Sequence, residues 1–211
     1  MASIANSAFE VSVSNSTRRE TQNIPGYFGS GTGSNFAGEI CAAGFLCVRS
    51  ELALSEGYEA QELLNGNTWR MVAASSGAVD GRPGDHTGIY AFNSYDTAMA
   101  RQGANAWRLG AKTLGLELAA GERGDFTELI VGEQYTWGAG NFSTAPTDLE
   151  TTIYATISNG RLVATDTAPT DGSVYLRIWR SKNFTEGTRS APFVGYVCEV
   201  LRSVAAAGGE G

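Results

Sequence analysis

The sequence predicts a mainly β protein, an antiparallel β-sandwich or barrel with long Gly-rich loops and at most one short helix. Three observations favour this class. Apolar and polar residues alternate in many short runs, turn formers separate these runs, and strands do not alternate with helical segments. The 211 residues include 27 glycines, which suits a chain with many turns and bulges.

Residues 1–37 are predicted to form a short strand followed by an extended N-terminal arm. Apolar residues alternate with polar ones over residues 9–13, whereas residues 14–37 offer few core positions. Loops of this length are usually functional or ordered by a partner, so an arm lying on a neighbouring subunit is expected. A surface loop folded back on its own domain is an equal alternative. The aromatic residues that would anchor the arm to a partner are Tyr27, Phe28 and Phe36.

A β-rich globular domain is expected over residues 38–204, with a flexible tail at 205–211. A boundary near residues 141–149 is an alternative, because that stretch is rich in loop formers. Residues 40–48 are nearly all apolar, which predicts a strand covered on both faces and bent at Gly44.

Several further elements follow from the pattern of turns and alternation. Residues 58–64 could pair with 68–74 across an Asn-Gly turn, and residues 94–109 hold the best helix candidate. The clearest hairpin joins residues 153–157 to 162–164 across Ser158-Asn159-Gly160. Alternating runs at 114–118, 174–179 and 194–200 and an apolar run at 126–131 complete the predicted strands.

The charge balance argues against nucleic acid as the main partner. The net charge is −7, and phosphate binding needs a concentrated positive surface. The N-terminus lacks the pattern of a secretory signal, and no apolar stretch is long enough for a membrane span. Cys41, Cys47 and Cys198 form no CxxC pair and are expected to be buried free thiols in a chain made in a reducing cytoplasm.

Catalytic chemistry finds little support in the residue types. His86 is the only histidine, and it lies beside Asp85 without a recognisable nucleophile motif. A crowded acidic stretch could serve a glycosidase or hold Ca²⁺, but solvated acids are the expected interpretation. Its members are Glu117, Glu122, Asp125, Glu128 and Glu133. We therefore expect no catalytic residue, no cofactor site and no metal site.

Aromatic residues near loops suggest a different class of function. Trp137, with Tyr135, is the best candidate for an exposed ring that contacts a partner or stacks on a sugar. Core or interface packing is the default expectation for all four tryptophans. Arg123-Gly124-Asp125 matches a cell-adhesion tripeptide, although a turn at this place has its own structural reason.

The composite pattern resembles virion structural proteins of tailed bacteriophages, particularly head decoration (capsid cement) proteins. The start is rich in small residues, and a glycine-rich segment follows. The last third reads TIYATISNGRLVATDTAPTDGSVYLRIWRS and then FVGYVCEVL. The likeness covers residues 110–204 and is one of style without a diagnostic motif, so no residue role is carried over.

The resemblance implies a non-enzymatic protein that binds the outer surface of a phage capsid and stabilises it. Its partners would be the major capsid protein and copies of itself, in a homo-oligomer with a trimer as the guess from shell symmetry. It would be synthesised in the host cytoplasm and reside on the virion. A tail or baseplate module that binds a receptor or carbohydrate is the alternative.

Overall fold

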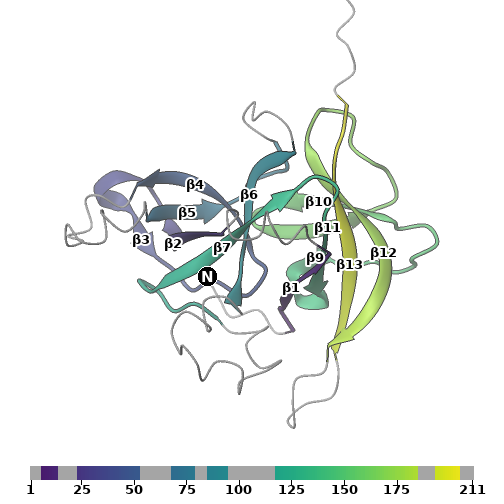
Figure 1. The fold of residues 1–211 in the computed structure, drawn as a ribbon, viewed down its shortest axis with the longest axis horizontal. Helices are drawn as coiled ribbons and strands as arrows, with labels where there is room; N and C mark the ends of the chain where they lie inside the picture. The colour runs from purple at the N-terminus through teal and green to yellow at the C-terminus, as the bar shows by residue number, and fades with distance from the viewer. Residues whose placement is uncertain are drawn as a thin grey trace, which may run out of the picture.

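The computed structural model describes residues 6–13, 23–52, 68–78, 85–94, 117–184 and 193–204. These residues form a mainly β structure in which a barrel lies beside a large sheet (Figure 1). The predicted fold class is confirmed, since both the barrel and the sandwich arrangement are present. Within the described ranges two short 3-10 helices appear, η1 (Gly33–Asn35) and η4 (Ala139–Asn141).

The barrel consists of five strands closed into a ring. Around the ring they follow the order β2-β5-β4-β6-β7, and the pairing of β2 with β7 closes it. All neighbours are antiparallel except β2 and β5. A short strand, β3 (Ala37–Gly38), adds to the end of β2. The barrel strands are β2 (Asn23–Ser30), β4 (Leu46–Leu52), β5 (Trp69–Ala73), β6 (His86–Phe92) and β7 (Arg123–Ile130).

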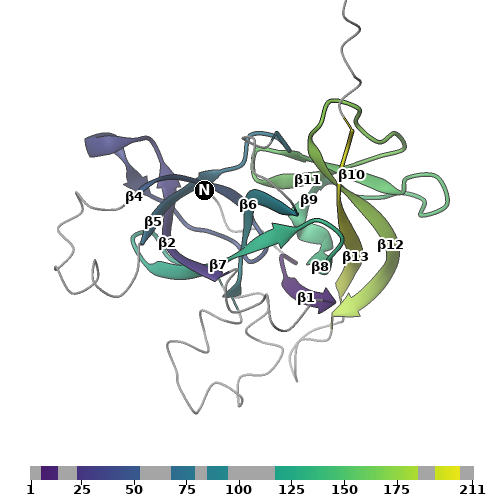
Figure 2. The same ribbon diagram turned by 45° about the horizontal axis from the view of Figure 1, so that its top comes forward.

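The second sheet has seven strands in the order β1-β8-β13-β12-β10-β11-β9 (Figures 1 and 2). Its pairs are antiparallel except for β9 with β11. The predicted hairpin across Asn159-Gly160 is confirmed as β10 and β11. The strands are β1 (Phe9–Val13), β8 (Gln134–Gly138), β9 (Phe142–Thr144), β10 (Tyr154–Ser158), β11 (Arg161–Thr165), β12 (Val174–Phe184) and β13 (Phe193–Arg202).

Two hydrophobic cores meet at one wall of the barrel. On β6, Tyr90 and Phe92 point into the barrel, whereas Ile89 and Ala91 pack against the seven-stranded sheet. The neighbouring strand β4 divides in the same way, with Cys47 inside the barrel and Leu46 facing the sheet. Alternate side chains of a strand point to opposite faces. A continuous apolar run such as residues 89–92 therefore places side chains in the barrel core and in the core beneath the large sheet.

The predicted N-terminal arm is wrong where the structure describes it. Residues 23–30 form β2, which pairs with β5 on one side and β7 on the other. Gly26 permits this position, because a Cβ there would meet Met71 Cγ at 2.5 Å inside the barrel. The glycines that suggested a loose arm therefore allow close packing within the barrel wall. Residues 14–22 lie outside the described part of the chain.

The other predicted elements have mixed outcomes. Residues 41–47 are all buried, and the chain bends at Gly44, where φ is +73°, before β4 begins. In the predicted run 68–74, residues 69–73 form β5, whose partners are β4 and β2, and the expected partner segment 58–64 lies outside the described residues. Residues 53–67, 95–116 and 205–211 lie outside the described part of the chain. They include most of the predicted helix and the whole predicted tail.

The chain passes from the barrel to the large sheet at residues 131–133, which is before the suggested boundary at 141–149.

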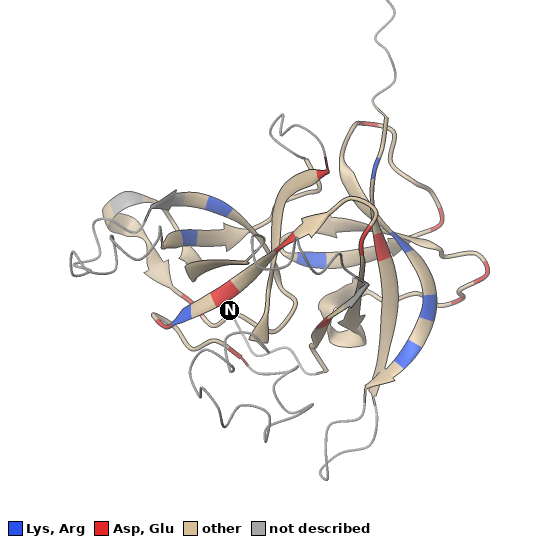
Figure 3. Ribbon diagram, viewed as in Figure 1, with Lys and Arg blue, Asp and Glu red and all other residues tan. Residues whose placement is uncertain are grey.

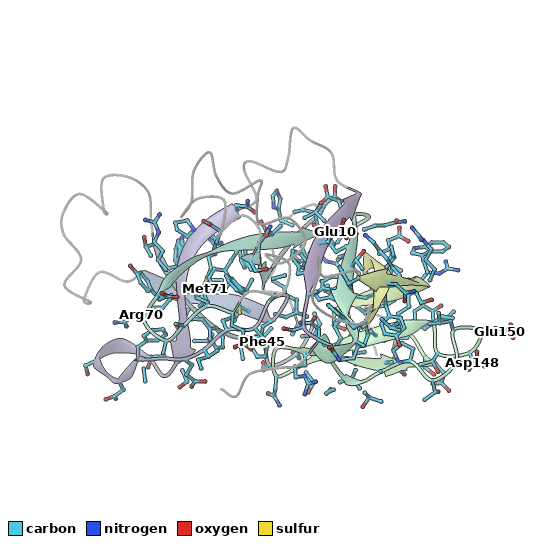
Figure 4. All side chains as sticks on the ribbon, turned by 90° about the horizontal axis from the view of Figure 1, so that it is seen from below. Glu10, Phe45, Arg70, Met71, Asp148 and Glu150 are labelled. Atoms are coloured by element: carbon cyan, nitrogen blue, oxygen red, sulfur yellow. The ribbon has the colours of Figure 1, made fainter. Side chains whose placement is uncertain are left out.

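A turn from the large sheet fits closely against the residue that leads into β4. Gly160 ends the β10–β11 turn with φ +76°, and a Cβ built on it would lie 2.1 Å from the Phe45 ring. Gly160 also donates its N–H to the Ala74 carbonyl and accepts from the Leu46 N–H. Figure 4 shows Phe45 between the barrel and the sheet. This contact holds the two parts of the fold in register.

Replacing Gly160 with alanine should destabilise the protein by more than the same change at Gly121. Both glycines have φ +76°, so both substitutions carry the left-handed penalty of about 1–2 kcal/mol. Nothing lies within 4 Å of a Cβ at Gly121, whereas Gly160→Ala must also displace Phe45, which adds about 1–3 kcal/mol. Urea unfolding of the two variants measures the difference, and equal losses of stability would contradict the packing described here.

Candidate functional site

The most prominent polar cluster contains the only histidine and a buried carboxylate. His86 Nδ1 lies 3.0 Å from Glu128 Oε2, and the Gly88 N–H donates to Glu128 Oε1 at 2.9 Å. The side chain of His86 is 60% exposed, whereas that of Glu128 is 7% exposed. Both residues lie at one end of the barrel, where the first residue of β6 pairs with the last residue of β7. The structure thus joins His86 to Glu128, whereas the sequence suggested Asp85 as its partner.

A second buried carboxylate binds a tyrosine at the start of the large sheet. The Tyr135 hydroxyl donates to Glu133 Oε2 at 2.8 Å and accepts from the Ile130 N–H at 3.2 Å. Burial, followed by the charge of Glu133, raises the pKa of Tyr135 far above its usual value. The phenol is therefore neutral and holds the connection between β7 and β8 in place.

These groups bond strands together and show no arrangement for nucleophilic catalysis. Among the described residues, the His86 ring contacts Glu128 and no serine or cysteine. Burial raises the pKa values of the Cys41 and Cys198 thiols, which disfavours the reactive thiolate. No three His, Cys, Asp or Glu side chains in the described ranges converge as metal ligands.

The crowded acidic stretch separates into residues with different surroundings. Glu122 Oε2 accepts from the Ala119 N–H at 3.1 Å and so closes the turn before β7. Glu128 and Glu133 make the contacts described above, and Glu117 and Asp125 are half-buried. The Arg123-Gly124-Asp125 tripeptide lies at the start of β7, paired with β2, and not in a free turn.

The predicted aromatic contacts with a partner are wrong for four of the five residues, because these side chains are buried. Tyr135 and Trp137 are 0% exposed and pack with Phe9, and the Trp137 indole donates to the Gly44 carbonyl at 3.1 Å. Phe28 is buried in the barrel core, and the side chain of Tyr27 is also buried, with 7% exposed. Phe36 alone is half-buried, with the Arg70 guanidinium 4.9 Å from its ring centroid.

Within the described ranges the exposed aromatic residue is Trp179, which the sequence places in a predicted strand without a contact assigned to it. It is 48% exposed on the face of the large sheet that points away from the barrel. A bulge in β12 lies between Ile178 and Arg180, and it adds Trp179 as an extra residue on the outer side. The alternation of Tyr175, Arg177 and Trp179 with apolar residues was the signal that pointed to this face.

Neighbouring residues hold the Trp179 ring in a defined position. The Arg177 guanidinium lies 4.3 Å from the ring centroid, and the indole N–H donates to Glu199 Oε2 at 2.9 Å. Tyr154 and Tyr175 form an edge-on pair beside this stack, with ring centroids 5.8 Å apart. We call Tyr154, Tyr175, Arg177, Trp179 and Glu199 the outer-face cluster. A ring fixed in this way loses little conformational entropy when a partner covers it.

Comparison with known proteins adds no family to this description, because no family model, curated protein or solved structure matches the chain. No helix in the described ranges is long and apolar enough to cross a membrane.

All three cysteines should be unreactive in the folded protein. They are free and buried, as the sequence predicted, and burial disfavours the thiolates of Cys41 and Cys198. Ellman's reagent should therefore label the native protein slowly and all three thiols rapidly in denaturant. Fast labelling of even one thiol in the native state would contradict the burial described here.

Proposed function

We propose that this chain is a non-enzymatic structural protein of a virus particle, which binds the outer surface of a phage capsid and stabilises it. Its partners would be the major capsid protein and copies of itself. Two independent features support this role: the likeness of residues 110–204 to phage decoration proteins in sequence style, and a large sheet with an aromatic cluster on its outer face.

The outer-face cluster is the observation that carries the proposal. Tryptophan, tyrosine and arginine are the residue types that dominate the binding energy of protein interfaces. Here they occur together on one sheet face, and Trp179 is 48% exposed although it is one of the largest apolar side chains. An exposed ring that lies beside two tyrosines and an arginine on one face is the kind of surface that marks a protein interaction site.

Carbohydrate binding, as in a tail or baseplate module, is the second candidate, and Trp179 favours it over the buried Trp137. Sugars stack on exposed tryptophan rings, but they also need free polar groups around the ring. The indole N–H is already bonded to Glu199, and Arg177 covers part of the ring. These internal contacts favour a protein partner.

Purified protein should bind to capsids that lack it in a fixed stoichiometry, and Trp179→Ala should weaken this binding. Loss of a central tryptophan at an interface costs at least about 2 kcal/mol, a decrease in affinity of about 30-fold. Cosedimentation of protein with purified capsids at increasing concentration measures both quantities.

Arg123→Glu is the matched control, because Arg123 is also exposed but lies on the barrel. Its binding should equal that of the unmodified protein. Absence of binding at micromolar concentrations would refute the decoration role. Glycan-array hits that disappear with Trp179→Ala would support the carbohydrate module instead.

A further inference from the structure

Basic residues lie along β12 of the large sheet, and acidic residues lie on loops at one end of the same sheet (Figure 3). Arg177 and Arg180 are exposed on β12, and Arg180 forms no ion pair in the described part of the chain. Four acids lie on the loops that flank β10 to β12 at one end of the sheet. They are Asp148, Glu150, Asp166 and Asp171, all exposed.

Strand pairing places both acidic loops at the same end of the sheet. Tyr154, the first residue of β10, pairs with Thr165 on β11 and with Arg177 on β12. The loop before β10 and the loop after β11 therefore leave the sheet side by side. Figure 4 shows Asp148 and Glu150 at the far tip of the first loop, away from the barrel.

Hydrogen bonds within the acidic loops hold two of the carboxylates in position. Hydrogen bonds from Ser173 lower the pKa of Asp171, whose Oδ1 accepts the Ser173 N–H at 3.0 Å. Asp148 accepts from the Glu150 N–H at 2.9 Å. These carboxylates are thus fixed as acceptors on a chain whose net charge is already −7.

We infer that the outer-face cluster, together with Arg180, binds the acidic loops of a second copy of this chain. This inference rests on the proposed function and specifies it further: the cluster would support capsid binding through contacts between neighbouring copies on the shell. Trp179 and the two tyrosines would supply the apolar centre of the contact, and Arg177 and Arg180 would face the carboxylates.

Charge complementarity selects this occupant and this orientation. If two copies met face to face in parallel, acids would oppose acids, and like charges brought together cost several kcal/mol. Antiparallel or head-to-tail contact brings the acids of one copy to the arginines of the other. Since the two surfaces differ, the contact closes either as a two-fold pair that forms both contacts or as a ring.

Other charges on the face do not remove this complementarity. Glu199 lies opposite Arg177 on β13 and binds the Trp179 indole, and Lys182 contacts Glu10 on β1. Lys182 and Glu10 are thus paired within one copy. Within the described ranges neither Arg177 nor Arg180 forms an ion pair, and both can therefore face the carboxylates of a second copy.

Charge reversal and charge exchange test the contact by sedimentation of the full chain. The face variant is Arg177→Glu with Arg180→Glu, and the loop variant is Glu150→Lys with Asp166→Lys. Each variant alone should associate at least about tenfold more weakly than the unmodified protein, because it opposes like charges. An equal mixture of the two should regain association, since each altered surface then meets its altered complement.

Matched variants separate this contact from general effects. Arg123→Glu makes a single charge reversal of the same kind on the barrel and should leave association unchanged, whereas Trp179→Ala should weaken it at least about tenfold. Sodium chloride raised from 50 to 500 mM should also weaken association, because salt screens exposed charges. Circular dichroism and thermal unfolding verify that each variant is folded, and recovery in the mixture cannot arise from misfolded chains.

The oligomeric state and the capsid binding of these variants together decide whether the outer-face cluster binds a second copy. A 22.2 kDa monomer at all concentrations up to about 1 mM would refute it, as would association that the face and loop variants leave unchanged. If the protein stays monomeric but Trp179→Ala abolishes capsid binding, the face belongs to the capsid contact and the proposed function stands. If the charge exchange succeeds but no capsid binding occurs, self-association stands and the decoration role fails.

Discussion

The whole fold depends on one wall of strands that is buried on both faces. β4, β6 and β7 enclose the barrel with one set of side chains and pack against the seven-stranded sheet with the alternate set. Because alternation assigns each residue to one core, a shift of register by a single residue would exchange the two sets. The tight contact of Phe45 with Gly160 and the bend at Gly44 fix that register.

Sequence reasoning succeeded where local signals agree with the final structure. The hairpin of β10 and β11 has an Asn-Gly turn between two alternating runs, and these local features determine its pairing. It failed for β2, whose partners β5 and β7 are far away in the chain. Glycine indicates flexibility and close packing equally well in a sequence, and only the packed barrel shows that Gly26 serves the second purpose.

For the candidate site, too, local sequence patterns predict which residues share a face, whereas their exposure depends on strands that are distant in the chain. Alternation along β12 indicates that Trp179 and Arg177 share a face, but the exposure of that face depends on which side the barrel covers. Trp137 looked exposed because loop formers follow it, yet β1 and β13 flank its strand and Phe9 packs on its ring. Distant pairing also joins His86 to Glu128, which the sequence could not show.

The position of β13 also affects how the chain can fold during synthesis. This strand lies between β8 and β12, and its pairing with β12 is the longest ladder in the described structure. A ribosome produces β13 after all the other described strands, so β8 and β12 have no common neighbour until translation reaches it. The barrel strands are complete much earlier. Their side chains that later pack against the large sheet are therefore exposed during synthesis, and this apolar surface can aggregate until β13 is made.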